Sequence, residues 1–199
     1  MEATDIAHPR LELVITVDEE TGLTGAINLG KDMIHGKILL NLDSEDDAEV
    51  FIGCAGGVDT TAVFKYETVD APADYQYFKI EVKDGLGGHS GCDIHLGRAN
   101  ANKLVTRFVW QLMNKYEVAI AEFDGGNLRN AIPRAAYAIV GVPSSKKEEV
   151  RIALNHYVAD IANEYDGVEP TLSIDMESVA TPATCIDSAT AKNLIYALY

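Results

Sequence analysis

Two acidic clusters follow apolar segments of the sequence and could take part in metal chemistry. Glu19 and Glu20 come after the β-prone run 11–17, and Asp43 comes after a second such run, 37–42. Adjacent carboxylates suit metal-assisted hydrolysis, because one can bind a divalent cation while the other takes a proton from the attacking water. In a chain this acidic, each cluster taken alone is more typical of a solvated surface turn, and the residues alone leave both interpretations open.

Two glycine-rich turns carry polar side chains that could contact a ligand. Segment 85–91 presents His89, but Ser90 replaces the last glycine of a dinucleotide-binding pattern. Cys92 replaces the closing glycine of a nucleophile elbow, so that pattern fails as well. The second turn places Asn130 near the end of a predicted strand. Taken singly, such residues more often serve a surface turn than a functional site.

The composition excludes several classes of function. The 199 residues have a formal net charge of −15 without a basic stripe, which argues against nucleic-acid binding. No apolar run approaches the roughly 20 residues of a membrane helix, and the N-terminus lacks the features of a signal peptide. We therefore expect a cytoplasmic protein that does not bind membranes. Three widely spaced cysteines argue against a disulfide framework and against a thiolate zinc site.

The elements that would position the acidic clusters form a strand, helix and strand pattern. A third strand is predicted before the glycines at 53–57, which mark a domain boundary. The predicted strands are 11–17, 37–42 and 49–54, with a short helix at 24–28. Because ligands bind at the carboxyl ends of parallel strands, we expect Glu19, Glu20 and Asp43 to converge at one edge of the sheet.

The remainder of the chain is predicted to be an α+β unit. Its strands are 62–69, 76–83, 117–123, 135–142 and 168–176, and its helices are 99–116, 146–165 and 188–199. The long middle helix is expected to be capped by Ser144 or Ser145 and to bury Val150, Leu154, Val158 and Ile161. From residue 76 the order of elements is that of a ferredoxin-like sandwich.

Five short motifs carry a resemblance that extends through nearly the whole chain. In order, they are V-D-E-E-T-G (17–22), N-L-D-S-E (41–45), G-C-A-G-G (53–57), G-G-H-S-G (87–91) and L-R-N-A-I-P (128–133). Their order and spacing resemble those of the aminoacyl-histidine (Xaa-His) dipeptidases of the cytosolic non-specific dipeptidase type. These two-zinc metallopeptidases are related to carboxypeptidase G and the aminoacylases.

The resemblance implies a role for each matching residue. Glu19 corresponds to the general base, and Glu20 and Asp43 correspond to ligands of the two zinc ions of the full-length active site, which other divalent metals could replace. His89 and Asn130 correspond to the substrate-contacting residues of a lid. The implied reaction is hydrolysis of dipeptides, preferentially Xaa-His. The implied fold is an α/β segment of a zinc-peptidase catalytic domain at residues 1–57, followed by an α+β ferredoxin-like lid at residues 58–199.

Part of the family's pattern is missing from the sequence. None of the five histidines is followed two residues later by aspartate, so the His-x-Asp ligand motif is absent. We therefore expect a piece of a longer polypeptide that is inactive alone. One alternative is a non-catalytic lid and dimerisation fragment that forms a homodimer through the lid. The other alternative is an acidic cation-binding protein without hydrolase activity.

Overall fold

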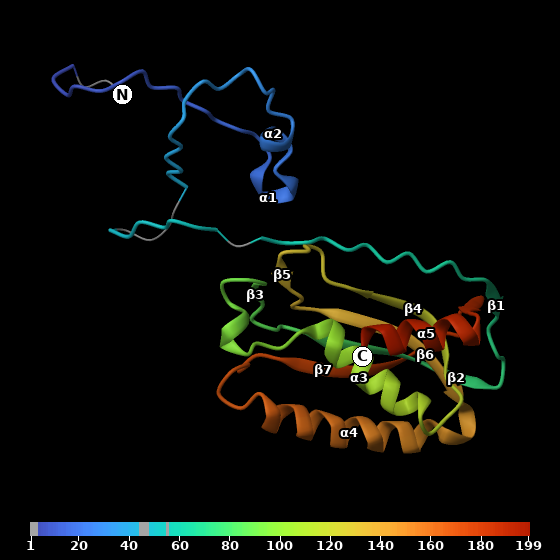
Figure 1. The fold of residues 1–199 in the computed structure, drawn as a ribbon. Helices are drawn as coiled ribbons and strands as arrows, with labels where there is room; N and C mark the ends of the chain where they lie inside the picture. The colour runs from blue at the N-terminus through green and yellow to red at the C-terminus, as the bar shows by residue number, and fades with distance from the viewer. Residues whose placement is uncertain (1–3, 44–47, 55) are drawn as a thin grey trace. The chain divides into compact units, whose positions relative to one another are not determined.

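A computed structural model describes residues 4–43, 48–54 and 56–199 (Figure 1). The chain divides into two compact units, Met1–Asp59 and Thr60–Tyr199, and each is described by itself. Among the described residues, no helix is both long enough and apolar enough to cross a membrane.

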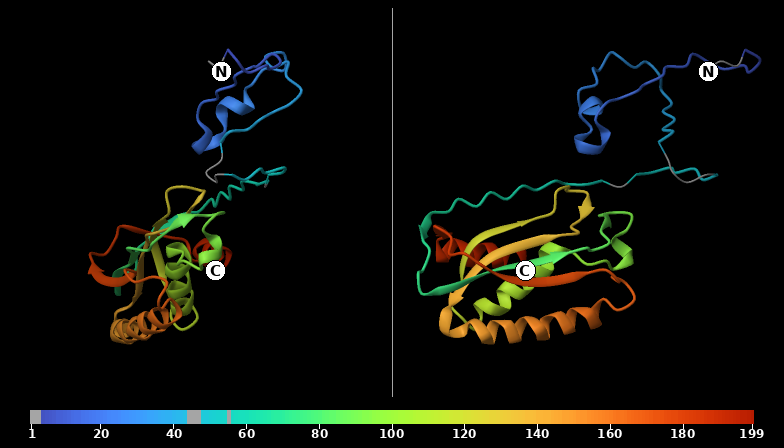
Figure 2. Two further views of the ribbon diagram at one scale, coloured as in Figure 1. Left: turned by 90° about the vertical axis from the view of Figure 1, so that its left-hand side faces the viewer. Right: turned by 180° about the vertical axis from the view of Figure 1, so that it is seen from behind.

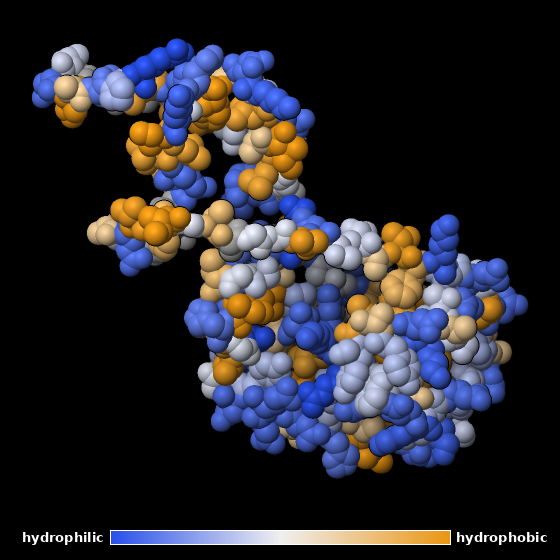
Figure 3. All heavy atoms as spheres, viewed as in Figure 1, coloured by the Kyte–Doolittle hydropathy of each residue, from blue (hydrophilic) through white to orange (hydrophobic). Residues whose placement is uncertain are grey.

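The first unit contains two short helices, α1 (Glu19–Gly22) and α2 (Thr24–Ile27), of which α2 was predicted. Its described residues include no strand, so the strands predicted at 11–17, 37–42 and 49–54 are wrong. The physical reason is that a strand needs a neighbour to satisfy its backbone groups and cover its side chains. Here the apolar side chains of these segments lie at the surface, as the orange spheres of this unit show (Figure 3).

The second unit is built on a four-stranded antiparallel sheet with strand order β4-β6-β2-β7. Its strands and its two long helices follow one another along the chain as strand, helix, strand, strand, helix, strand (Figures 1 and 2). These elements are β2 (Tyr75–Lys83), α3 (Ala101–Met113), β4 (Ala119–Gly125), β6 (Ala136–Pro143), α4 (Lys147–Glu164) and β7 (Ser173–Val179).

The core lies between one face of this sheet and the helices. Alternate residues of β2, namely Phe78, Ile80 and Val82, are fully buried there. The apolar stripe of α3 packs against them, and its Phe108 ring stacks on Tyr157 of α4 with centroids 5.1 Å apart. Helix α5 (Ser188–Leu198) contributes buried residues to the same core. The predicted strands and helices of this part therefore form, with two exceptions.

The first exception concerns strand bounds. Only Thr68–Asp70 (β1) of the predicted strand 62–69 is extended, and it pairs with β8 (Thr184–Ile186). Strand β7 begins at Ser173 instead of residue 168, because the preceding residues make a hydrogen-bonded turn in which the Val168 and Glu169 N–H groups donate to the Tyr165 carbonyl.

The second exception is the start of α4. Neither Ser144 nor Ser145 caps this helix, because Ser144–Lys146 forms a 3-10 turn (η2) and the Ser144 hydroxyl donates to the Asp74 carbonyl at 2.6 Å. The predicted buried face is otherwise correct, except that Val158 is only half-buried and Tyr157 takes a fully buried place beside it.

Candidate functional site

The acidic pair Glu19 and Glu20 is exposed and lies on α1, within a tight chain reversal. Asp18 precedes the pair in a left-handed conformation (φ 60°), and its carboxylate accepts a hydrogen bond from the Thr24 hydroxyl. The Gly25 N–H donates to the Val17 carbonyl at 3.0 Å, an approach so close that a Cβ at Gly25 would lie 2.6 Å from the Val17 nitrogen. The pair therefore projects from a helical turn and not from the end of a strand.

Asp43 is also exposed, in a segment without regular structure, and its N–H donates to the Asn41 side chain at 3.1 Å. The sheet edge at which Glu19, Glu20 and Asp43 were expected to converge does not form among the described residues of this unit. No group of three or more His, Cys, Asp or Glu side chains that could hold a metal occurs among the residues described. Glu20 and Asp43 are suitable oxygen donors for a divalent cation, but together they make an incomplete ligand set.

The structure brings the two glycine-rich turns of the second unit together. Strand β3 (Gly88–His89) pairs with β5 (Ala131–Ile132), with His89 opposite Ala131. The pairing continues in a hydrogen bond of 2.8 Å from the Ser90 N–H to the Asn130 carbonyl. His89 is exposed and Asn130 is partly exposed. His89 on β3 and Asn130, which directly precedes β5, are far apart in the sequence and were matched by separate motifs, yet their backbones lie side by side.

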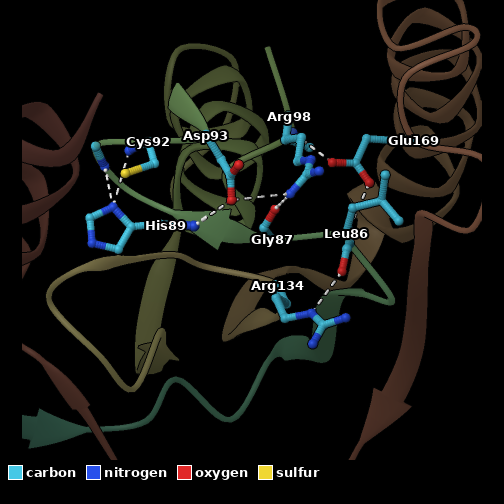
Figure 4. Close-up of polar contacts among 11 residues, drawn as sticks. Leu86, Gly87, His89, Cys92, Asp93, Arg98, Arg134 and Glu169 are labelled. Carbon is cyan, nitrogen blue, oxygen red and sulfur yellow. Dashed lines mark hydrogen bonds and ion pairs between the residues drawn. The ribbon is translucent and has the colours of Figure 1, made fainter. Parts of the chain in front are cut away.

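The His89 ring has a defined orientation within its own loop. Its Nδ1 accepts hydrogen bonds from the N–H groups of Gly91 and Cys92, at 3.0 and 3.1 Å (Figure 4). Because Nδ1 is the acceptor, the proton of the neutral ring lies on Nε2. The exposed imidazole can therefore donate a hydrogen bond through Nε2 to a negatively charged or carbonyl oxygen.

The glycines before His89 are required by close packing. Gly87 and Gly88 have φ angles of 65° and 139°, which favour glycine. A Cβ at Gly87 would lie 2.4 Å from Cγ of Arg134, and one at Gly88 would lie 2.5 Å from Nη1 of Arg98. The small residues thus allow two arginine side chains to pack against the backbone that carries His89.

A hollow of about 680 Å³ lies beside the two turns. Its lining includes the three cationic residues Arg98, Lys103 and Arg129 and contains no aspartate or glutamate among the described residues. In a chain with 31 acidic and 16 basic residues, such a lining favours an anionic ligand group. Arg98 is also tied to the loop, because it donates to the Gly87 carbonyl at 2.6 Å and lies 3.6 Å from the Asp93 carboxylate.

Comparison with known proteins shows a family to which the sheet-bearing unit is similar. Residues 80–169, which run from β2 to the turn after α4, match the family described as "Peptidase dimerisation domain". This part of the chain is therefore similar to peptidase dimerisation domains. It contains both His89 and Asn130.

The longer similarity is to dipeptidases. Over 176 residues, the chain is 38% identical to the cytosol non-specific dipeptidase of Escherichia coli (strain K12), covering 88% of this chain and 36% of that protein. The crystal structure of aminoacylhistidine dipeptidase from Vibrio alginolyticus is 40% identical, with a TM-score of 0.73 over 92% of this chain and 37% of that one. The resemblance stated from the motifs is confirmed, and the chain spans little more than a third of the length of these relatives.

Two residues that hold the loop 86–99, here called the His89 loop, were not predicted from the sequence. Asp93 accepts the His89 N–H at 2.8 Å, and Glu169 accepts backbone N–H groups at both ends of the loop. Asp93 lies two residues after the G-G-H-S-G motif but was not predicted to contact it, whereas Glu169 is distant in sequence from the groups it contacts. No local signal could have identified Glu169.

Proposed function

We propose that the full-length protein is a zinc-dependent dipeptidase of the cytosol that hydrolyses dipeptides, preferentially Xaa-His. The observation that carries the proposal is the 40% identity and 0.73 TM-score to an aminoacylhistidine dipeptidase over 92% of this chain. The pairing of the His89 and Asn130 turns supports it, because it brings the backbones of the two matched substrate-contacting residues next to each other.

The three acidic residues Glu19, Glu20 and Asp43 of the first unit have distinct roles in this proposal. Glu19 acts as the general base that takes a proton from the attacking water, while Glu20 and Asp43 each supply one oxygen ligand to a two-zinc centre. Zinc, when bound, polarises the scissile carbonyl and lowers the pKa of water to about 7. Three or four ligands are usual for zinc, so the centre needs further ligands besides Glu20 and Asp43.

The second unit serves as a ferredoxin-like lid that binds the substrate. The His89 Nε2–H and the Asn130 amide donate hydrogen bonds to the developing oxyanion or to the substrate carboxylate. The cationic hollow beside them suits the same terminal carboxylate, because Arg98, Lys103 and Arg129 contribute positive charge to its lining, Arg98 being also paired with Asp93.

The test uses the full-length protein and a dipeptide with C-terminal histidine. Glu19→Gln should abolish turnover and leave zinc content unchanged, whereas Glu20→Gln and Asp43→Asn should lower zinc content as well as turnover. Glu49→Gln provides a matched control, because Glu49 is an exposed glutamate of the same unit outside the proposed site. Full turnover by Glu19→Gln, or unchanged zinc content in both ligand variants, would contradict the assignment.

A second candidate function applies to the 199-residue chain alone, namely a non-catalytic lid and dimerisation module. It is favoured by the match to a peptidase dimerisation domain and by the incomplete metal-ligand set among the described residues. The chain should then form a homodimer in sedimentation equilibrium and should not cleave dipeptides with added zinc. Turnover that Glu19→Gln abolishes would show that this chain is itself the enzyme.

A further inference from the structure

A buried carboxylate lies behind the His89 loop. Glu169 has only 7% of its surface exposed, and it is the only buried charged residue among those the structure describes. It is located in the turn between α4 and β7. A charged group is expensive to bury unless hydrogen bonds compensate, so a buried glutamate requires an explanation in its contacts.

Both oxygens of Glu169 accept backbone hydrogen bonds from the loop that carries His89. Oε2 accepts from the Leu86 N–H and Oε1 accepts from the Ala99 N–H, each at 2.8 Å (Figure 4). Leu86 and Ala99 are the two ends of this loop. One carboxylate therefore fixes the separation of the points at which the loop leaves and re-enters the folded unit.

The contacts continue from the loop ends to His89 itself. Beside Ala99, Arg98 donates to the Gly87 carbonyl at 2.6 Å and lies 3.6 Å from Asp93. Asp93 in turn accepts the His89 N–H at 2.8 Å. The backbone of His89 is thus connected to both ends of the loop through charge-assisted hydrogen bonds, which are stronger than neutral ones, and through the Arg98–Asp93 ion pair.

Glu169 is itself held in place by the end of α4. Its N–H donates to the Tyr165 carbonyl at 3.1 Å, and its own carbonyl accepts the Leu172 N–H at 3.4 Å. Tyr165 also lines the cationic hollow. The carboxylate is therefore fixed relative to the surface at which the substrate is proposed to bind.

We infer that Glu169 is a positioning residue that sets the placement of the His89 imidazole on the lid; the inference rests on the proposed dipeptidase function. The Leu86 and Ala99 N–H groups both need an acceptor, and a carboxylate provides one on each of its two oxygens. Glutamine keeps the size of the side chain but turns an NH₂ group toward one of them, so one end of the loop loses its partner. The loop then shifts, and a shift of about 1 Å in a catalytic group can reduce a rate by roughly 100-fold.

The experiment compares Glu169→Gln with Glu164→Gln in the full-length protein. Glu164 is an exposed glutamate five positions earlier that pairs with Arg107, outside the His89 loop. Glu169→Gln should lower kcat about 10- to 100-fold without loss of zinc, and Glu164→Gln should leave kcat unchanged. If Glu169→Gln does not fold, Glu169→Asp, whose shorter side chain can reach only one loop end, replaces it.

Two further readouts separate positioning from a general structural role. In a His89→Ala background, Glu169→Gln should cause little additional loss of kcat, because residues acting through one another are not additive. The ¹⁵N signals of the His89 ring in the 199-residue chain should also change with Glu169→Gln and not with Glu164→Gln. Additive losses, or unchanged His89 signals, would overturn the positioning role.

The outcomes also distinguish this inference from the proposed function. Full activity of His89→Ala would overturn the proposed role of His89 in dipeptide hydrolysis, whatever the effect of Glu169. Full activity of Glu169→Gln beside an impaired His89→Ala enzyme would overturn only the positioning role.

Discussion

Replacement of His89 by alanine should impair catalysis with little effect on folding. The ring is exposed, and its two contacts are the N–H groups of Gly91 and Cys92, both at the surface, where water can replace the lost acceptor. What the variant loses is the Nε2–H donor. Removal of one preorganised donor to a developing oxyanion costs about 2.7–4 kcal/mol, so kcat should fall roughly 100- to 1,000-fold.

The assay is steady-state hydrolysis of an Xaa-His dipeptide by the full-length protein, with zinc content and thermal unfolding measured in parallel. His95→Ala is the matched control, because His95 is an exposed histidine on the short helix η1 (Ile94–Leu96) of the same loop. Unchanged kcat in His89→Ala, or an equal loss in both variants, would refute the proposed donor role. Loss of zinc from His89→Ala would instead show that His89 is a metal ligand.

Three further predictions concern the stability of the second unit. Gly141→Ala should lower the free energy of unfolding of this unit by about 1–3 kcal/mol in urea titrations, because the new Cβ would lie 2.4 Å from the buried Tyr77 ring. An unchanged urea midpoint of unfolding would contradict this packing. Asn100→Ala removes the side-chain cap of α3 and should cost about 1 kcal/mol, whereas no change would mean that the cap is replaced by water. The Lys83 ammonium lowers the pKa of the Asp175 carboxyl, so the stability from this pair is present above the unfolded pKa of about 4 and is lost as the pH falls through the lower folded value. Asp175→Asn should therefore reduce the loss of stability between pH 6 and pH 3, and an identical loss in both proteins would contradict the assignment.

Much of the sheet-bearing unit could be predicted from the sequence because its signals are local. Strand β2 alternates Phe78, Ile80 and Val82 with polar residues, and all three apolar side chains are fully buried. In α3 the apolar residues recur every four positions, and the side chains on that stripe are buried as well. Each of these segments meets its partners within the same unit, so the pattern in the sequence and the burial in the structure agree.

The arrangement of the candidate site on the lid could be predicted only in part. The motifs identified His89 and Asn130, but their pairing depends on two-residue strands, which are too short to show any periodicity. The contacts of Glu169 with Leu86 and Ala99 span 83 and 70 positions of the chain. Hydrogen bonds of such long range leave no local pattern, and a buried glutamate in a turn looks like any exposed one until the fold is known.

In the first unit, the prediction of strands from apolar runs was wrong for a physical reason. Leu39, Leu40 and Leu42 belong to an apolar run typical of a parallel strand covered on both faces, yet they are 84%, 76% and 87% exposed. Such a run forms a strand only when neighbouring strands satisfy its backbone and helices cover its side chains, and the described residues of this unit provide neither. The described residues of this unit thus contain no sheet that would bring Asp43 toward Glu19 and Glu20. A metal site whose ligands follow such strands can form only together with the sheet that orders them, and this dependence favours the proposal that catalysis requires the longer protein.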